Sequence, residues 1–409
     1  MSTPITERLK PVIRSLSGEK AFLYIAKAKE IAELKKIKVI SFGVGQPDIP
    51  TFKNIVNAAK KALDEGFTGY TETAGISELR KAIAEYLNKR YGSDVEVEEI
   101  IVTTGAKTAI FLAIASFIGP GDEVLIPDPT YPAYPEITKL FGGKPVYIPM
   151  KFDPENGFRL DLKLLKEKIS DRVKMIILNN PHNPTGAVFR PDEISQLLDI
   201  AKDHNIIVLV DEIYDNFIYE DGVFRSVLEL EREWRKYILY VNGFSKTFSM
   251  TGWRLGYIVA SKDVIDHIRR LATNVYSCPP SFAQKAGIEA LKSSESWQSV
   301  REMVERFRKR RDIMYEELRK IPGIEVWKSI GAFYMFPRVN TILKKLSMDV
   351  EQFVDWLLEN YGVVILPGTA FSETDMGREF VRFSFAIDEK DIIEGIDRIR
   401  RAITEKQTY

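Results

Sequence analysis

The feature of this chain that most restricts its fold is a long alternation of extended and helical patterns, from about residue 53 to residue 300. The extended segments include continuous apolar runs such as IIVLV at residues 206–210, which are typical of strands buried on both faces of a parallel sheet. Helical patterns separate these runs, and AIFLAIASFIG at residues 109–119 is apolar enough for a buried helix. The alternation therefore predicts an α/β domain with a mostly parallel sheet flanked by helices.

The two ends of the chain carry mixed patterns instead. Residues 17–36 have apolar positions at helical spacing, whereas residues 321–339 alternate like a pair of strands. We expect residues 1–52 and 301–409 to form a smaller α+β domain together, packed beside the large domain of residues 53–300.

Composition excludes several classes of partner. Lys and Arg total 58, as do Asp and Glu, so no overall charge attracts nucleic acid or an anionic membrane. The single cysteine, Cys278, and three scattered histidines give no metal-ligand spacing. The N-terminal segment has no apolar signal-peptide core, and the longest apolar run is too short to span a bilayer. We therefore expect a cytoplasmic protein that binds neither nucleic acid, membrane nor metal.

Lys246 lies in an unusual setting, the stretch VNGFSKTFSMTGWRLG at residues 241–256. Most lysines are solvated surface charges, and that is the alternative interpretation here. However, Lys246 is surrounded by small residues and little other charge, which leaves room for a ligand against the backbone. The stretch therefore indicates a buried, reactive amine.

The same stretch fits the pattern small-x-Ser-Lys-x-x-Ser-x-x-Gly-x-Arg-x-Gly. This pattern resembles the lysine site of the class I and II aminotransferases, in the branch similar to aspartate aminotransferase. The resemblance implies fold type I, pyridoxal 5'-phosphate as cofactor, and a homodimer with active sites at the subunit interface. It also implies that an amino group moves between an L-amino acid and a 2-oxo acid in a ping-pong cycle. Lys246 would be bonded to the cofactor and act as acid and base.

Three further residues have counterparts in the family. Asp211 ends a buried strand, where a carboxylate needs a cation, and the cofactor's ring nitrogen would supply one. The alternative for Asp211 is an ordinary helix N-cap. The resemblance places Tyr214 beside the cofactor's 3-oxygen, and it gives Asn183, in the motif Asn-Pro-Thr-Gly, the same contact and one to the substrate carboxylate.

A phosphate site is expected where a helix begins near Ala106, because helix N-termini present free N–H groups and partial positive charge. Gly105, Ala106 and Lys107 would contribute there, and the resemblance adds Ser245 and Arg254. Lys107 opposes the helix dipole at this position, a cost that a nearby anion would remove.

The resemblance also assigns two tyrosines to the cofactor. Tyr131 would stack on its ring, and Tyr70 would reach across the dimer interface to the phosphate of the other subunit. Each could equally be an ordinary loop tyrosine.

Substrate contacts follow from the same resemblance. Arg382, in a strand of apolar neighbours, would hold the α-carboxylate, and it could otherwise be a solvated charge on an edge strand. Gly45, Tyr131 and Asn183 would complete the site. Lys107 would meet a distal carboxylate, or else serve only the phosphate.

The most favoured substrates are aspartate and glutamate with 2-oxoglutarate and oxaloacetate. The alternatives are an aromatic or broad-specificity aminotransferase, including the kynurenine type, a cofactor-dependent β-lyase, and a non-catalytic regulator on the same fold. A regulator would usually carry an N-terminal DNA-binding domain, and the residues before Gly43 show no helix-turn-helix pattern.

Overall fold

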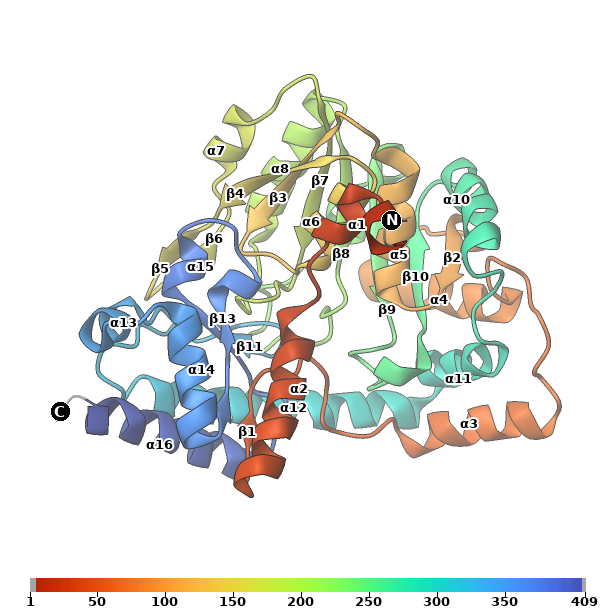
Figure 1. The fold of residues 1–409 in the computed structure, drawn as a ribbon. Coiled ribbons are helices and arrows are strands. Elements are labelled where there is room, and N and C mark those ends of the chain that lie inside the picture. Colours follow the sequence, from red (N-terminus) through yellow and green to blue (C-terminus); the bar gives the residue numbers. More distant parts are fainter. Residues whose placement is uncertain (1–4, 407–409) are drawn as a thin grey trace.

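A computed structural model describes residues 5–406 of the chain (Figure 1). Its centre is a seven-stranded sheet in the order β2-β10-β9-β8-β7-β3-β4. All neighbours pair in parallel except β10, which is antiparallel to both β2 and β9. The predicted α/β class with a mostly parallel sheet is therefore confirmed. The strands are β2 (Ile100–Thr103), β3 (Glu123–Asp128), β4 (Lys144–Pro149), β7 (Val173–Asn179), β8 (Ile207–Asp211), β9 (Ile238–Gly243) and β10 (Gly256–Val259).

Alternate residues of the central strands face opposite helical layers, as the two-residue period of a strand requires. In β7, Met175 and Ile177 lie in the core shared with α5 (Ala106–Phe117) and α10 (Lys262–Val275). Ile176 and Leu178 lie in the core on the other face, which includes α8 (Pro191–Asp203). Both faces are covered, which explains why these strands are continuous apolar runs rather than alternating ones.

Elements from both chain ends lie together beside this layered unit (Figure 1). Strand β1 (Ile40–Ser41) pairs in parallel with β12 (Val363–Val364), so the two ends share a sheet. A second sheet has the order β11-β14-β13 and is antiparallel. Its strands are β11 (Tyr334–Met335), β14 (Val381–Ser384) and β13 (Leu366–Pro367), and the surrounding helices are α2 (Lys20–Lys35), α13 (Asn340–Leu346), α14 (Val350–Tyr361), α15 (Met376–Glu379) and α16 (Glu389–Lys406).

The division of the chain into residues 53–300 and a unit built from 1–52 and 301–409 stays a proposal. The pairing of β1 with β12 supports it. Helix α12 (Ser294–Leu318) runs across residue 300 without a break, so that boundary falls inside a helix rather than in a loop.

The strand pair expected over residues 321–339 is mostly wrong. Only β11 forms a strand there, and a single isolated bridge joins Glu325 to Arg338. The rest of the segment packs aromatic side chains such as Phe333 and Phe336 into the core without a regular ladder. Residues 331–337 are buried in succession, so the segment is a continuously buried stretch rather than a pair of strands with one solvated face.

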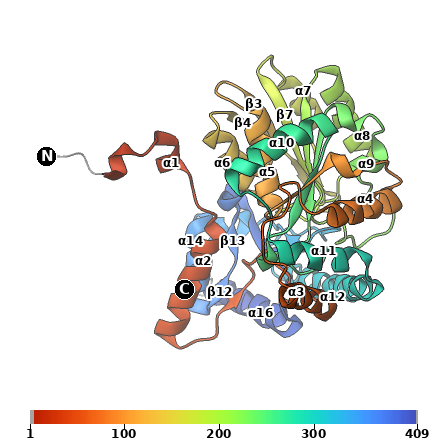
Figure 2. The ribbon, with the colours of Figure 1, turned by 90° about the vertical axis from the view of Figure 1, so that its right-hand side faces the viewer.

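The N-terminal arm lies apart from the rest of the chain. Figure 2 shows the segment around α1 (Pro11–Ser15) reaching away from the body before α2 begins. Its apolar side chains Ile5, Leu9 and Ile13 are exposed. Within residues 5–406, no helix has both the length and the apolar character needed to cross a membrane.

The remaining short elements complete the connections. They are η1 (Ile5–Arg8), α3 (Lys53–Asp64), α4 (Ser77–Tyr91), η2 (Val97–Glu99), α6 (Ala133–Leu140), β5 (Lys151–Asp153), β6 (Gly157–Arg159), α7 (Leu162–Glu167), α9 (Val227–Leu230), η3 (Trp234–Lys236), η4 (Thr251–Trp253), α11 (Ser281–Lys292) and η5 (Gly368–Ala370).

Candidate active site

A pocket of about 440 Å³ opens at the carboxyl ends of the central parallel strands. Asn179 at the end of β7 and Asp211 at the end of β8 both line it. The start of α5, the connection between β9 and β10, and the β14 strand contribute further walls. Ligands of parallel α/β sheets bind at this edge, because the loops that follow neighbouring strands converge there.

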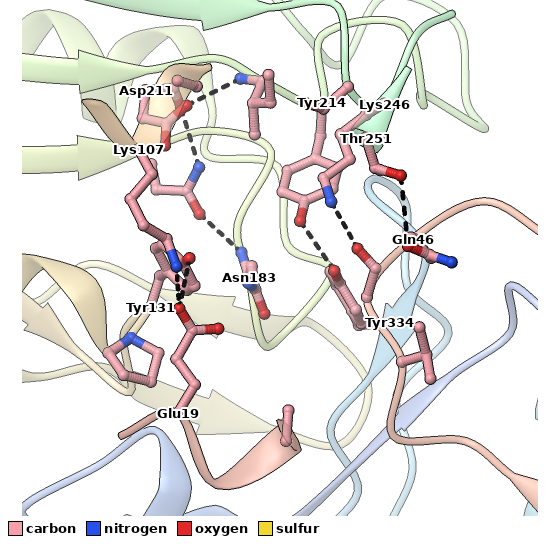
Figure 3. A pocket seen from close by; sticks show the side chains of 18 of the residues that line it. Glu19, Gln46, Lys107, Tyr131, Asn183, Asp211, Tyr214, Lys246, Thr251 and Tyr334 are labelled. Atoms are coloured by element: carbon pink, nitrogen blue, oxygen red, sulfur yellow. Dashed lines mark hydrogen bonds and ion pairs between the residues drawn. The ribbon is translucent and has the colours of Figure 1, made fainter. Parts of the chain in front are cut away.

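Lys246 lies in the β9–β10 connection, and its half-buried side chain lines the pocket (Figure 3). Its Nζ donates a hydrogen bond to the carbonyl oxygen of Gly45 at 2.5 Å. Burial lowers the pKa of Lys246 to about 8, with the charge of Arg382 as the next cause. A lowered pKa makes the neutral, nucleophilic amine accessible near physiological pH.

Two glycines that face one another allow the N-terminus of α5 to approach the β9–β10 connection that carries Lys246. Gly243 and Gly256 face one another across β9 and β10. A Cβ on Gly256 would lie 2.4 Å from the backbone nitrogen of Ala106 at the start of α5. Any larger residue would therefore push the Lys246 connection away from the helix N-terminus.

Asp211 is buried at the end of β8, where it accepts hydrogen bonds from Tyr134 Oη at 2.8 Å and from the backbone N–H of Ile213 at 3.1 Å. Burial outweighs these bonds and the charge of Lys246, and it raises the pKa of Asp211 to about 6. No helix begins at Asp211, because turns follow it, so the alternative of a helix N-cap is wrong. A buried acid at a pocket wall suits a ligand that brings a cation.

Asn183 is positioned by Asn179, a residue that was not predicted to belong to the site. The side-chain oxygen of Asn179 accepts from the backbone N–H of Asn183 at 2.9 Å, and its amide nitrogen donates to the carbonyl oxygen of Asp211 at 2.9 Å. Asn179 thus connects the two neighbouring strand ends and fixes the turn that carries Asn183. The adjacent asparagines that end this strand were the only signal in the sequence.

Arg382 is 4% exposed in β14, the middle strand of its sheet, so it is not a solvated edge charge. Its guanidinium donates to Asn183 Oδ1 at 3.1 Å and to the carbonyl oxygen of Gly43 at 2.7 Å. The rings of Tyr334 and Phe371 lie 4.4 and 4.5 Å from it. Its Nε is buried without a hydrogen-bond partner among the described residues, which leaves donor capacity for a carboxylate ligand.

Tyr214 hydrogen-bonds through its hydroxyl to the hydroxyl of Tyr334 at 2.8 Å. Both rings are buried, and Tyr334 also packs over Arg382. Tyr334 was not among the site residues predicted from the sequence. It comes from the irregular segment that was expected to be a strand pair, and nothing in that pattern distinguished it from a core aromatic.

The residues expected to hold phosphate lie together. Gly105 has a φ of +93°, and a Cβ there would lie 2.4 Å from Arg254 Nη2, so the missing side chain lets the guanidinium reach the start of α5. Arg254 also donates to the carbonyl oxygen of Thr251 at 2.7 Å. Ala106, Ser245 and Arg254 all line the pocket. These donors form a cradle suited to an anion.

The side chain of Lys107 turns toward the N-terminal end of α2 (Figure 3). It is ion-paired with Glu19, and its Nζ lies 5.6 Å from the centre of the Tyr131 ring. Tyr131 donates its hydroxyl to the same Glu19 carboxylate at 3.0 Å. Glu19 was not predicted from the sequence, because its position in the pocket depends on how α2 packs.

Tyr70 lies outside this pocket. Its side chain is 93% exposed, and it is the one predicted site residue that the single chain leaves fully in solvent.

Comparison with known proteins agrees with this geometry. The sequence profile of the aminotransferase class I and II family matches residues 37–399. An aspartate aminotransferase of Sulfurisphaera tokodaii is 55% identical over 389 residues, covering 95% of this chain and 96% of the relative.

Two solved structures are similar throughout. The aspartate aminotransferase of Thermus thermophilus with maleate superposes with a TM-score of 0.88 at 33% identity, covering 96% of this chain and 99% of the other. An aromatic aminotransferase of Pyrococcus horikoshii superposes with a TM-score of 0.85 at 36% identity, covering 93% and 100%. These similarities confirm the fold implied by the motifs: the chain belongs to the class I and II aminotransferases.

Proposed function

We propose that this aminotransferase acts on aspartate and glutamate, with 2-oxoglutarate and oxaloacetate as amino acceptors. The observation that carries this proposal is a pair of cationic side chains, Arg382 and Lys107, at separate places in the pocket that contains Lys246. A dicarboxylic substrate has two anionic groups to satisfy, so it can use both cations. The names of the similar aspartate aminotransferases support the same choice.

The pocket fits pyridoxal 5'-phosphate, the cofactor of this family. It offers a buried amine at Lys246, a buried acid at Asp211, and the donors around Arg254 and the start of α5 for a phosphate. When bound, the cofactor supplies an electron sink that makes the α-hydrogen of an amino acid removable near neutral pH.

The protein's own groups would orient that chemistry. Lys246 would carry the covalent attachment and then, as a free amine held beside the substrate, move a proton from its α-carbon to the cofactor's C4'. Asp211 would keep the ring nitrogen protonated. Asn183 and Tyr214 would hold the 3-oxygen, and Tyr131 would cover one face of the ring.

Phosphate and substrate would bind at different parts of the lining. The backbone of Gly105, Ala106 and Lys107, with Ser245 and Arg254, would hold the phosphate. Arg382 and Asn183, with Gly45 nearby, would hold the α-carboxylate. The Lys107 side chain, turned toward Glu19 and Tyr131, supports its role with the distal carboxylate rather than the phosphate.

The chain would work as a homodimer. Tyr70 of the partner subunit would reach the phosphate, which accounts for a site tyrosine that is fully exposed in the single chain. The N-terminal arm exposes apolar side chains, and a second copy of the chain would cover them. Sedimentation of the purified protein tests this state, and a monomer at micromolar concentration would contradict it.

A substrate screen tests the function. The protein loaded with cofactor is mixed with aspartate and 2-oxoglutarate, and glutamate and oxaloacetate are measured. The same assay with phenylalanine or kynurenine tests the aromatic alternative, for which the similar Pyrococcus enzyme is the specific reason. Release of ammonia or pyruvate instead of transfer would indicate a β-lyase.

A further inference from the structure

An acidic side chain lies among the cations of the substrate pocket. Glu19 lines the pocket, is 23% exposed, and directs its carboxylate toward the large-sheet side (Figure 3). There it is ion-paired with Lys107 and accepts a hydrogen bond from Tyr131 at 3.0 Å. The roles given above leave Glu19 without any part in the reaction.

This ion pair occupies the charge that a distal carboxylate would need. A second carboxylate that approaches Lys107 meets the negative charge of Glu19, and like charges at contact distance repel. A neutral side chain has no such conflict, and the pocket lining next to Glu19 includes Ala21, Phe22 and Ile25 from the same helix. A dicarboxylic substrate therefore requires Glu19 to leave Lys107, whereas a neutral substrate does not.

The neighbouring residue shows how Glu19 could leave without the helix detaching. Lys20 donates to Glu351 at 3.3 Å and to Thr369 at 3.1 Å, both in the C-terminal part of the chain. Two consecutive side chains thus contact different parts of the chain, Glu19 the start of α5 and Lys20 the C-terminal part. Release of Glu19 from Lys107 would leave the Lys20 contacts in place.

A released Glu19 also has an alternative partner close by. It is the N-cap residue of α2, yet its side chain makes no capping hydrogen bond, and the first turn of α2 contains no acidic residue. Free N–H groups and partial positive charge at that helix start would accept the carboxylate.

We propose that Glu19 is an exchangeable counter-ion that occupies the distal-carboxylate position on Lys107, leaves when a dicarboxylic substrate binds, and stays when a neutral one binds. Glu19 would thereby set the preference between the two substrate classes. The inference rests on the proposed function, because it takes Lys107 as the anchor for the distal carboxylate.

Ligand binding to the cofactor-loaded protein tests the proposal without turnover. Succinate serves as the dicarboxylate and 3-phenylpropionate as the neutral-tailed ligand, and both affinities are measured by calorimetry. Glu19→Gln keeps the shape and removes the charge. We expect it to bind succinate roughly three- to tenfold more tightly, the scale of a partly exposed ion pair, and 3-phenylpropionate within about twofold of wild type. Unchanged or weaker succinate binding would overturn the proposal.

Two variants separate this effect from a general loosening of α2. Lys20→Met removes the contacts with the C-terminal part of the chain, and we expect it to change the affinity for both ligands by the same factor. In a Lys107→Met background, Glu19→Gln should no longer improve succinate binding, because the competition is for Lys107. An improvement that persists without Lys107 would contradict the exchange.

The outcomes also distinguish this inference from the proposed function. If wild type transaminates aspartate but Glu19→Gln leaves succinate binding unchanged, only the inference fails. If Glu19→Gln binds succinate more tightly than wild type but neither protein transaminates aspartate, the inference holds and the aspartate preference fails. If neither protein binds dicarboxylates, both fail.

Discussion

The two cationic anchors of the pocket differ in how they are held. Arg382 is 4% exposed, lies between two aromatic rings, and donates to an amide and a carbonyl oxygen rather than to an acid. The Lys107 side chain is 46% exposed and already has a carboxylate partner in Glu19. One anchor is fixed and unneutralised, and the other is solvated and neutralised by a removable group.

This difference matches the task at each place. Every amino acid and 2-oxo acid in the cycle has an α-carboxylate, so a rigid guanidinium fork can be kept ready for it. Side chains vary between the two half-reactions, so the other anchor must accept more than one kind of group. Substitutions at each side chain test whether Arg382 and Lys107 differ in this way.

The largest effect is expected at the fixed anchor. Arg382→Ala should lower kcat/KM for every amino donor by about 10² to 10⁴, because loss of one partner of a desolvated charge pair costs about 3–5 kcal/mol. Dicarboxylic and aromatic donors should suffer alike, and cofactor binding should be spared. Steady-state kinetics on aspartate and phenylalanine check this, and an unchanged affinity for either donor would reassign the arginine.

The next effect concerns Lys246, whose folded pKa of about 8 lies below its ordinary value of 10.5. Between these two values the unfolded chain binds more protons than the folded chain, so stability rises with pH across that window. The rise should approach about 3 kcal/mol for the protein without cofactor, at about 1.4 kcal/mol for each pH unit between the two pKa values. Denaturant unfolding at pH 7 to 11 measures it.

Substitutions of Lys246, Arg382 and Lys107 test the cause of this pH dependence. Lys246→Met should abolish the rise, and equal slopes for wild type and variant would contradict the assigned pKa. After burial, the charge of Arg382 is the main cause of the lowered pKa of Lys246. Arg382→Leu should therefore raise the pKa of Lys246, whereas Lys107→Met should leave this pKa in place, because the charge of Lys107 is not among the main causes of the shift.

A smaller effect is expected at the exchangeable anchor. Lys107→Met should weaken the binding of dicarboxylic substrates by about fivefold, since a solvated ion pair contributes about 1 kcal/mol, and should change the binding of aromatic substrates by about twofold or less. The ratio of the two kcat/KM values is the readout. Equal losses for both classes would make Lys107 a phosphate ligand only.

The smallest effects are expected when one tyrosine hydroxyl is removed beside each of the two cationic side chains. Tyr334→Phe removes the hydroxyl beside Tyr214, and Tyr131→Phe removes the hydroxyl that holds Glu19. Each change costs about 1 kcal/mol of hydrogen bonding. The first should affect both substrate classes equally, whereas the second should shift the preference toward dicarboxylic substrates. Identical patterns from both variants would show that the two anchors do not differ in kind.

The sequence predicted most of the large sheet because both of its faces are buried. A continuous apolar run such as residues 206–210 has few alternatives to a central strand, and β8 forms there. The strand pair expected over residues 321–339 was mostly wrong, because residues 331–337 are buried in succession and the backbone there forms only β11 and isolated bridges.

Site residues divide in a similar way. Those in short motifs, such as Lys246 and Asn183, could be predicted to lie at a ligand site because the motif is visible in the sequence, and both residues line the pocket. Tyr134, Asn179 and Glu19 could not, because they act through contacts made only when distant segments fold together. These supporting residues carry no local pattern.

We propose that Lys246 is the pocket amine that binds the cofactor covalently, in the same pocket as the buried acid Asp211. The direct measurement is the visible absorbance of purified wild type and Lys246→Ala after incubation with pyridoxal 5'-phosphate and removal of the excess. The account predicts a stable absorbance band in wild type that borohydride fixes to the chain, and a folded, colourless variant. A wild type that stays colourless, or a variant that retains the band and turns over like wild type, would contradict it.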